Sequence, residues 1–137
     1  MTGARLLVTG SRRWADREAV TRALDDAVRG LGAQPADVTL VVGDCPTGAD
    51  QVATQWARRN GVGLEVFRAS WRTYGKAAGP IRNQAMVDSG ADLALAFWLP
   101  GSKGTTHAMT AARTAGVPVR LLSDGHDAPH GWEANLV

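Results

Sequence analysis

The stretch that indicates the fold most directly reads Leu6-Leu7-Val8-Thr9-Gly10-Ser11-Arg12. Three apolar residues give way to a polar turn that contains a glycine, and a helix-like run follows. This order is typical of a buried parallel strand that ends in a loop. The same change from strand to loop to helix recurs along the 137-residue chain, which predicts an α/β protein.

The repeated pattern defines the expected elements. Strands are expected at residues 6–8, 38–42, 64–67, 93–97 and 117–122. Asp16 caps a first helix closed by Gly32, a second helix carries residues 49–57, a third runs from Pro80 through Val87, and a fourth covers residues 105–115. We predict a single Rossmann-like, doubly wound, mostly parallel sheet with helices on both faces. Residues 1–122 are assigned to this domain and residues 123–137 to a polar C-terminal tail that frays.

The overall composition disfavours binding to duplex DNA and leaves binding to a small anion open. Fifteen Lys and Arg residues against thirteen Asp and Glu residues give a formal charge of +2, too small and too evenly spread for a DNA footprint. No apolar run is long enough to cross a membrane, and the lone Cys45 excludes an internal disulfide, so a cytoplasmic protein is expected. His107 stands apart from the tail residues His126 and His130, so neither a metal nor a cofactor is expected.

Four polar, glycine-rich segments lie where strands give way to helices, at residues 9–12, 43–50, 78–83 and 100–106. Loops that leave the carboxyl ends of parallel strands emerge on one edge of the sheet, so these segments are expected to converge. The turns at the opposite edge, such as Asn60-Gly61 and Ser89-Gly90, are short, end helices, and contain few side chains that could bind or react with a ligand. This asymmetry predicts a site at the carboxyl edge.

The last segment, Pro100-Gly101-Ser102-Lys103-Gly104-Thr105-Thr106, predicts a phosphate site. Its glycines let the backbone curl and aim successive N–H groups at an anion in front of the helix. It lacks the Gly-Lys-Ser/Thr ending of a P-loop, and a plain turn capped by Thr105 or Thr106 is the alternative. Arg82 lies in the first turn of its helix, where a positive charge is unfavourable for the helix dipole. A bound anion would explain an arginine at this position; the alternative is an arginine that is solvated at the surface.

Two carboxylates and a thiol lie in the second segment. Asp44 follows a strand, where it can accept hydrogen bonds from ribose hydroxyls or act on a reacting centre. Asp50, near the start of a helix, is interpreted first as a residue that satisfies the helix dipole. Cys45 has no histidine close by in the sequence and is interpreted as an incidental thiol.

Aromatic residues near the four segments are candidates for the walls of a ligand pocket. Ser11, Arg12 and Trp14 combine a hydroxyl, a guanidinium and a flat ring, which together can hold a nucleotide. Residues 69–79 are long for a connection and are interpreted as a lid or pocket wall. The expected walls are Trp14, Trp71, Tyr74 and Trp98, whereas the helical spacing of Trp56 predicts a core position.

The candidate ligand-binding residues come from all four segments. They are Gly10, Ser11, Arg12, Gly43, Asp44, Arg82, Asn83, Gly101, Ser102, Gly104, Thr105 and Thr106.

The motifs Thr9-Gly-Ser-Arg, Gly43-Asp-Cys-Pro-Thr-Gly-Ala-Asp, Ala78-Gly-Pro-Ile-Arg-Asn and Gly101-Ser-Lys-Gly-Thr-Thr-His together resemble the SLOG superfamily, in particular its YspA/YpsA-related branch. The resemblance extends over roughly residues 4–122. It implies a Rossmann-like sheet that binds a nucleotide-derived ligand at its carboxyl edge and senses or processes it. The oligomers usual among the LOG relatives imply a homodimer or a higher homo-oligomer.

Within this superfamily, LOG enzymes hydrolyse the N-glycosidic bond of cytokinin nucleotides. The segment 100–108 keeps the LOG glycine loop but has Ser102 in place of its second glycine and Ala108 at the position of the catalytic glutamate. LOG-type phosphoribohydrolase activity is therefore not expected. The resemblance thus favours a phosphate cradle without the LOG catalytic acid.

Three functions remain open at this point. The first is binding of a nucleotide or nucleotide-derived ligand. The second is cleavage of a glycosidic or phosphate bond, with Asp44 replacing the missing glutamate. The third is binding of single-stranded DNA through Arg12, Arg13, Arg68 and Arg72, which the low net charge disfavours.

Overall fold

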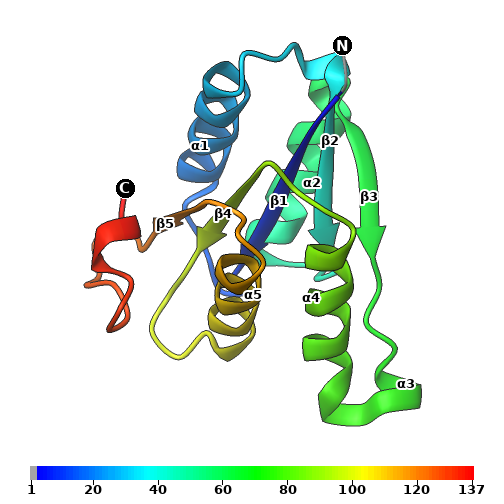
Figure 1. Ribbon diagram of the computed structural model, residues 1–137, viewed down its shortest axis with the longest axis vertical. Helices are drawn as coiled ribbons and strands as arrows, with labels where there is room; N and C mark the ends of the chain where they lie inside the picture. Colours follow the sequence, from blue (N-terminus) through cyan, green and yellow to red (C-terminus); the bar gives the residue numbers. More distant parts are fainter. Residues whose placement is uncertain (1–2) are drawn as a thin grey trace.

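Five short strands pair into one parallel sheet in the computed structural model, which describes residues 3–137 (Figure 1). The strands are β1 (Ala4–Gly10), β2 (Val38–Gly43), β3 (Gly63–Phe67), β4 (Leu93–Phe97) and β5 (Val119–Leu122), in the order β3-β2-β1-β4-β5. The predicted Rossmann-like α/β fold is confirmed.

Helices connect the strands and cover both faces of the sheet (Figure 1). The four longer ones are α1 (Arg17–Gly30), α2 (Gly48–Asn60), α4 (Ala78–Asp88) and α5 (Lys103–Thr114). Shorter turns are α3 (Trp71–Tyr74) and the 3₁₀ segments η1 (Pro35–Asp37), η2 (Gly75–Ala77) and η3 (Glu133–Asn135). Across residues 3–137, no helix combines the length and the apolar character needed to span a membrane.

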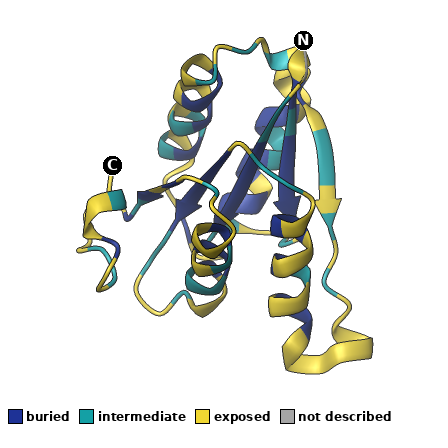
Figure 2. Ribbon diagram, in the orientation of Figure 1, coloured by how far each residue is buried: buried dark blue, intermediate teal, exposed yellow. Residues whose placement is uncertain are grey.

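The alternation of side chains along β1 builds two core layers. Leu6 and Val8 pack in the layer that α1 and α2 cover, which also holds Trp56 in its predicted core position. Leu7 points the other way and packs with Met109 of α5. Because helices cover both faces of the sheet, β1, β2 and β4 are mostly buried, whereas the edge strand β3 is partly exposed (Figure 2).

The first helix begins where the sequence predicts it. The Asp16 side chain accepts a hydrogen bond of 3.0 Å from the backbone N–H of Ala19, which satisfies one of the free donors of the first turn. In the sheet, β2 and β3 lie on one side of β1, whereas β4 and β5 lie on the other side. The direction of winding therefore reverses between β1 and β4, and a crevice opens at their carboxyl ends.

The segment 69–79 contains more structure than its sequence suggested. It holds α3 and η2, and α4 begins at Ala78, two residues before Pro80. This segment projects beyond the carboxyl ends of the strands as a mostly exposed arm (Figures 1 and 2). We call residues 69–77 the arm.

The C-terminal residues pack on the domain, so the expectation that they fray is wrong. Trp132 is only 3% exposed, and the guanidinium of Arg113 lies 3.6 Å from its ring centroid. Leu136 forms a bridge with Leu121 of β5, and the Val137 N–H donates to the Leu121 carbonyl at 2.8 Å. Burial of Trp132 thus holds this segment on the domain, although many of the segment's other residues are polar.

Candidate functional site

Hydrogen bonds tie the polar loops together at the carboxyl edge. Arg13, in the β1–α1 loop, donates through Nη2 to the carbonyl of Pro100 in the β4–α5 loop at 2.9 Å. Thr47, in the β2–α2 loop, donates through Oγ1 to the carbonyl of Arg12 at 3.1 Å. The expectation that these loops converge is confirmed.

Glycine allows the closest approach between two of these loops. Gly48 has a φ of +71°, and a Cβ at this position would lie 2.2 Å from the Ser11 carbonyl oxygen. No side chain fits there, so the β2–α2 loop closes directly onto the β1–α1 loop.

The start of α4 connects to both neighbouring loops. Arg82 donates through Nη1 to Asp44 Oδ1 at 2.9 Å, which joins α4 to the end of β2. Asn83 donates through Nδ2 to the Gly104 carbonyl at 3.1 Å, which joins α4 to the first turn of α5. Arg82 and Asn83 therefore join α4 to the loops on both sides of the crevice.

Two adjoining cavities open between these loops, with volumes of about 370 and 450 Å³. Residues from β1, the β2–α2 loop, α4 and the start of α5 line the first one. It includes ten of the expected ligand-binding residues: Gly10, Ser11, Arg12, Gly43, Arg82, Asn83, Gly101, Ser102, Gly104 and Thr105. Asp44 lines the second cavity. The first volume suits a mononucleotide-sized ligand.

The first turn of α5 offers backbone donors to the first cavity. Within residues 3–137, the N–H groups of Gly104 and Thr105 donate to no other group, whereas the N–H of Thr106 bonds the Ser102 carbonyl. Gly104 has open space around the position of a Cβ. An anion in the cavity can therefore reach two free N–H groups at the positive end of a helix dipole.

Arg82 supplies a largely buried positive charge on the opposite wall. Its Nη1 binds Asp44, and its Nε donates to Asn83 Oδ1 at 2.9 Å. In the described part of the chain, no group accepts a hydrogen bond from its Nη2. The guanidinium is thus oriented by Asp44, Asn83 and the Phe67 carbonyl, and it keeps Nη2 for a ligand.

Asp50 is a functional candidate whose position the sequence did not indicate. Thr47, not Asp50, occupies the N-cap of α2, and Asp50 is 7% exposed and lines the first cavity. Burial raises the pKa of Asp50 to about 7, although the nearby charge of Arg82 and a hydrogen bond from the Cys45 backbone both act to lower it. Asp50 thus lies in the first turn of α2, where the sequence places it, but its burial in the cavity adds an environment that the helix-dipole interpretation did not include.

Gly43 brings Asp50 and Arg82 close together. A Cβ at this position would lie 2.7 Å from Arg82 Nη1 and 2.9 Å from Asp50 Oδ2. Both side chains therefore pack against the bare backbone at the end of β2. The site requires glycine here because any larger residue would displace the arginine or the acid.

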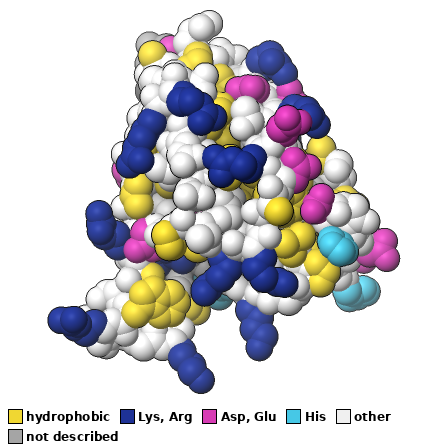
Figure 3. All heavy atoms as spheres, turned by 180° about the vertical axis from the view of Figure 1, so that it is seen from behind, with side chains coloured by type: hydrophobic (Ala, Val, Ile, Leu, Met, Phe, Trp, Pro, Cys, Tyr) yellow, Lys and Arg dark blue, Asp and Glu magenta, His cyan; other side chains and the backbone are white. Residues whose placement is uncertain are grey.

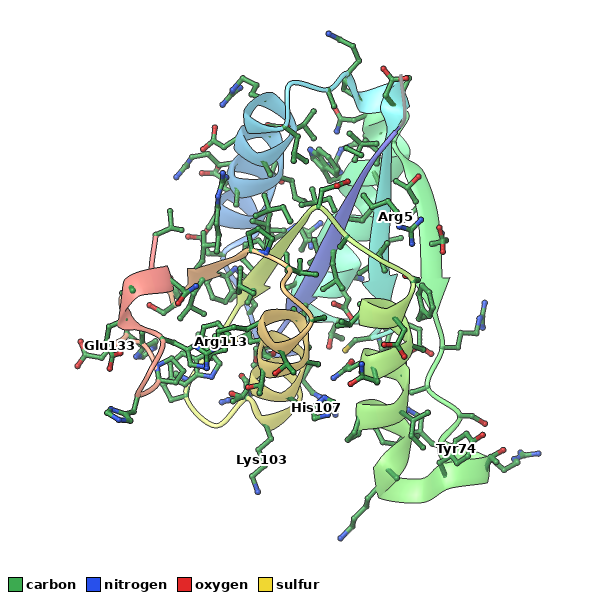
Figure 4. The ribbon with its side chains drawn as sticks, in the orientation of Figure 1. Arg5, Tyr74, Lys103, His107, Arg113 and Glu133 are labelled. Carbon is green, nitrogen blue, oxygen red and sulfur yellow. The ribbon has the colours of Figure 1, made fainter. Side chains whose placement is uncertain are left out.

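The aromatic residues divide between core and surface. Trp14 is 5% exposed and packs edge-on against Phe97 at 5.4 Å, so it belongs to the core and not to the cavity wall. Trp71, in the arm, is 53% exposed and lines both cavities, which agrees with the predicted wall. Tyr74 is exposed further along the arm (Figure 4).

Trp98 and Thr106 form a pair outside the cavity lining. Trp98 Nε1 donates to Thr106 Oγ1 at 3.1 Å, and the Thr106 hydroxyl donates to the Ser102 carbonyl. Both side chains use their polar atoms to stabilise the loop before α5. Neither residue lines the cavity; both stabilise the loop that contributes Ser102 to its wall.

Basic side chains surround the mouth of the cavity. Arg12, Arg13 and Lys103 line it, and Lys103 projects from the first turn of α5 (Figure 4). Seen from behind, Lys and Arg side chains are spread over the whole face, and those along its lower edge have no Asp or Glu side chain among them in this view (Figure 3). Although the net charge is small, the local charge at this edge favours an anionic ligand.

The fold and the site define a Rossmann-like α/β protein with a polar, basic crevice at the carboxyl edge of its sheet. The chain belongs to the YspA, cpYpsA-related SLOG family, whose family model matches residues 4–74.

Two further comparisons give one protein of similar sequence and one of similar fold. The chain is 45% identical to the Gene 61 protein of Mycobacterium phage D29 over 125 residues, which covers 88% of this chain and 97% of the phage protein. Its fold is similar to that of DNA processing protein A (DprA) from Streptococcus pneumoniae, with a TM-score of 0.63 and 16% identity. The match covers 88% of this chain but only 50% of the DprA chain, so it shows the fold alone.

Proposed function

We propose that the protein binds a nucleotide or nucleotide-derived ligand whose phosphate lies against the first turn of α5. The two free N–H groups of Gly104 and Thr105 are the observation that carries this proposal. They would bind two phosphate oxygens, and Arg82 Nη2 would supply charge from the opposite wall. The ligand is sensed or processed; the binding step is common to both roles.

The remainder of the ligand would extend toward the arm. Trp71 lines both cavities with half of its surface exposed, so one face of its ring is available to stack on a base. Asp44 lines the second cavity, where its free carboxylate oxygen could accept a hydrogen bond from a ribose hydroxyl.

We expect Gly104→Val to weaken binding of adenosine 5′-monophosphate by at least about tenfold. The valine side chain would occupy the open space in which the phosphate approaches the backbone. Arg82→Ala should cause a similar loss, because it removes a charge-assisted contact of about 1.5–3 kcal/mol. Calorimetric titration of each variant measures these losses.

Thr110→Val is the matched control for the glycine substitution. It places the same side chain at an exposed position of α5, away from the cavity, and should bind like the native protein. Unchanged affinity in both Gly104→Val and Arg82→Ala would rule out the proposed phosphate position.

Cleavage of a glycosidic or phosphate bond through Asp44 is the less favoured alternative. Asp44 Oδ1 accepts hydrogen bonds from both Arg82 and the Ala69 N–H, which leaves only Oδ2 to act on a substrate. Ala108 is buried in α5, so the position of the LOG glutamate offers no acid. The proposal therefore includes no LOG-type activity. Single-stranded DNA binding has less support, since the cavity is sized for a small ligand.

We further propose a homodimer or higher homo-oligomer that functions in the cytoplasm. Trp71, Tyr74 and Ile81 are exposed hydrophobic residues on the arm and the adjacent start of α4. Such a concentration of exposed apolar surface is typical of an interaction site. Sedimentation equilibrium at micromolar concentrations tests this part of the proposal, and a monomer throughout would contradict it.

A further inference from the structure

A buried carboxyl group lies in a cavity whose other features favour an anion. Asp50 lines the same cavity as Gly104 and Thr105, with their free N–H groups, and as Arg82. Asp50 Oδ2 and Arg82 Nη1 lie 2.9 and 2.7 Å from the position that a Cβ on Gly43 would take. An ionised carboxylate at this place would repel a phosphate, so the geometry requires an explanation.

The charged groups around Asp50 come from every loop of the site. Arg82 of α4 attracts the ionised carboxylate, whereas Asp44 repels it. Cys45 lies in the same loop, and its backbone donates a hydrogen bond to Asp50. Arg12, Arg13 and Lys103 line the cavity from the β1–α1 loop and from α5. Burial outweighs the attraction of Arg82 and brings the pKa of Asp50 to about 7, so both charge states are populated in the ligand-free protein near neutral pH.

A bound phosphate would shift this balance toward the protonated acid. Its negative charge repels the carboxylate, and its contact with Arg82 weakens the attraction that keeps Asp50 ionised. Once protonated, Asp50 no longer opposes the ligand, and its O–H becomes a hydrogen-bond donor within the cavity.

We propose that Asp50 determines the charge state in which this pocket binds its ligand: a phosphate-bearing ligand binds the form with Asp50 protonated, so that binding takes up a proton. The inference rests on the proposed function, since it assigns a role to Asp50 within the same site. The proton is taken from solvent and resides on the Asp50 carboxyl, and no covalent bond of the ligand is made or broken.

The test compares the affinity of the native protein and Asp50→Asn for adenosine 5′-monophosphate between pH 6 and pH 8. Asparagine matches the shape of the neutral acid but cannot ionise. Near pH 6 the two proteins should bind alike. Between pH 6 and pH 8 the native protein should lose about tenfold in affinity relative to the variant, because only the protonated fraction binds. The ligand's own phosphate is present in both titrations and cancels in the ratio.

A second measurement uses the native protein alone, so it does not depend on the fold of the variant. Inorganic sulfate keeps its charge throughout this pH range, and its affinity should also fall by about tenfold from pH 6 to pH 8. Binding of adenosine 5′-monophosphate with a pH-independent ratio between the native protein and Asp50→Asn would overturn the role of Asp50 but leave the proposed function intact. Absence of binding to either protein at any pH would overturn both.

Discussion

Replacing Asp50 with asparagine should make the ligand-free protein more stable at pH 8, by up to about 4 kcal/mol. The native acid is 7% exposed, and burial raises its pKa from 3.8 to about 7 on folding. The difference of about 3.2 pKa units, at about 1.36 kcal/mol per unit, gives this upper limit. Asparagine is not ionised at pH 8 and therefore avoids the desolvation of a buried charge.

The pH dependence follows from which state holds the proton. Between about pH 4 and pH 7 the folded protein keeps a proton on Asp50 that the unfolded chain has released. The contribution of this group to stability is therefore fully present below about pH 4 and is lost as the pH rises to about 7. Urea unfolding at pH 5 and pH 8 should show a fall in stability for the native protein that is largely absent from Asp50→Asn.

Asp26→Asn provides the control for this effect. Asp26 lies on the exposed surface of α1, where its ion pair with Arg29 contributes little to stability. This variant should keep the native pH profile. If Asp50→Asn were instead less stable than the native protein at both pH values, Asp50 would be a favourable ionised partner of Arg82, contrary to the account given above.

The second large effect is expected at the C-terminus, where Trp132→Ala should destabilise the protein by about 3–5 kcal/mol. Trp132 is almost completely buried between the sheet layer of β5 and the guanidinium of Arg113. Its removal would leave a cavity in the layer that also contains Met109 and Leu121. Thermal or urea unfolding of the full-length variant measures the loss.

Trp71→Ala is the matched tryptophan control. Trp71 is 53% exposed, so its truncation should change stability by less than about 1 kcal/mol. Equal and small effects for Trp71→Ala and Trp132→Ala would show that the C-terminal segment does not contribute to the packed domain.

The fold could be predicted from the sequence because its signals are local. Runs such as Leu93–Phe97 coincide with the predicted strand, and Asp16 caps the predicted helix through its own side chain. The order of strands and helices also forces the carboxyl-edge loops to one side of the sheet, so their convergence follows from the pattern alone. The C-terminal packing did not follow, because it depends on contacts between Trp132 and residues distant in the sequence.

The site could be predicted in outline but not in its buried details. Trp14 and Trp71 both lie near the polar segments, yet only the tertiary structure buries Trp14 against Phe97 and leaves Trp71 at the cavity. In the sequence, Asp50 resembles a helix-capping residue, because Thr and Asp are both preferred at the N-cap of a helix and Thr47 and Asp50 both lie near the start of α2. Its true environment depends on Gly43 and on Arg82, which comes from another helix.

A calorimetric comparison of adenosine 5′-monophosphate with adenosine, on the native protein at pH 6, tests the phosphate site most directly. The two ligands differ only in the group that Gly104, Thr105 and Arg82 are proposed to hold. The account predicts that the nucleotide binds at least about tenfold more tightly than the nucleoside, since charge-assisted hydrogen bonds each contribute about 1.5–3 kcal/mol. Equal affinity for the two ligands, or no binding of the nucleotide, would contradict a phosphate site at the carboxyl edge.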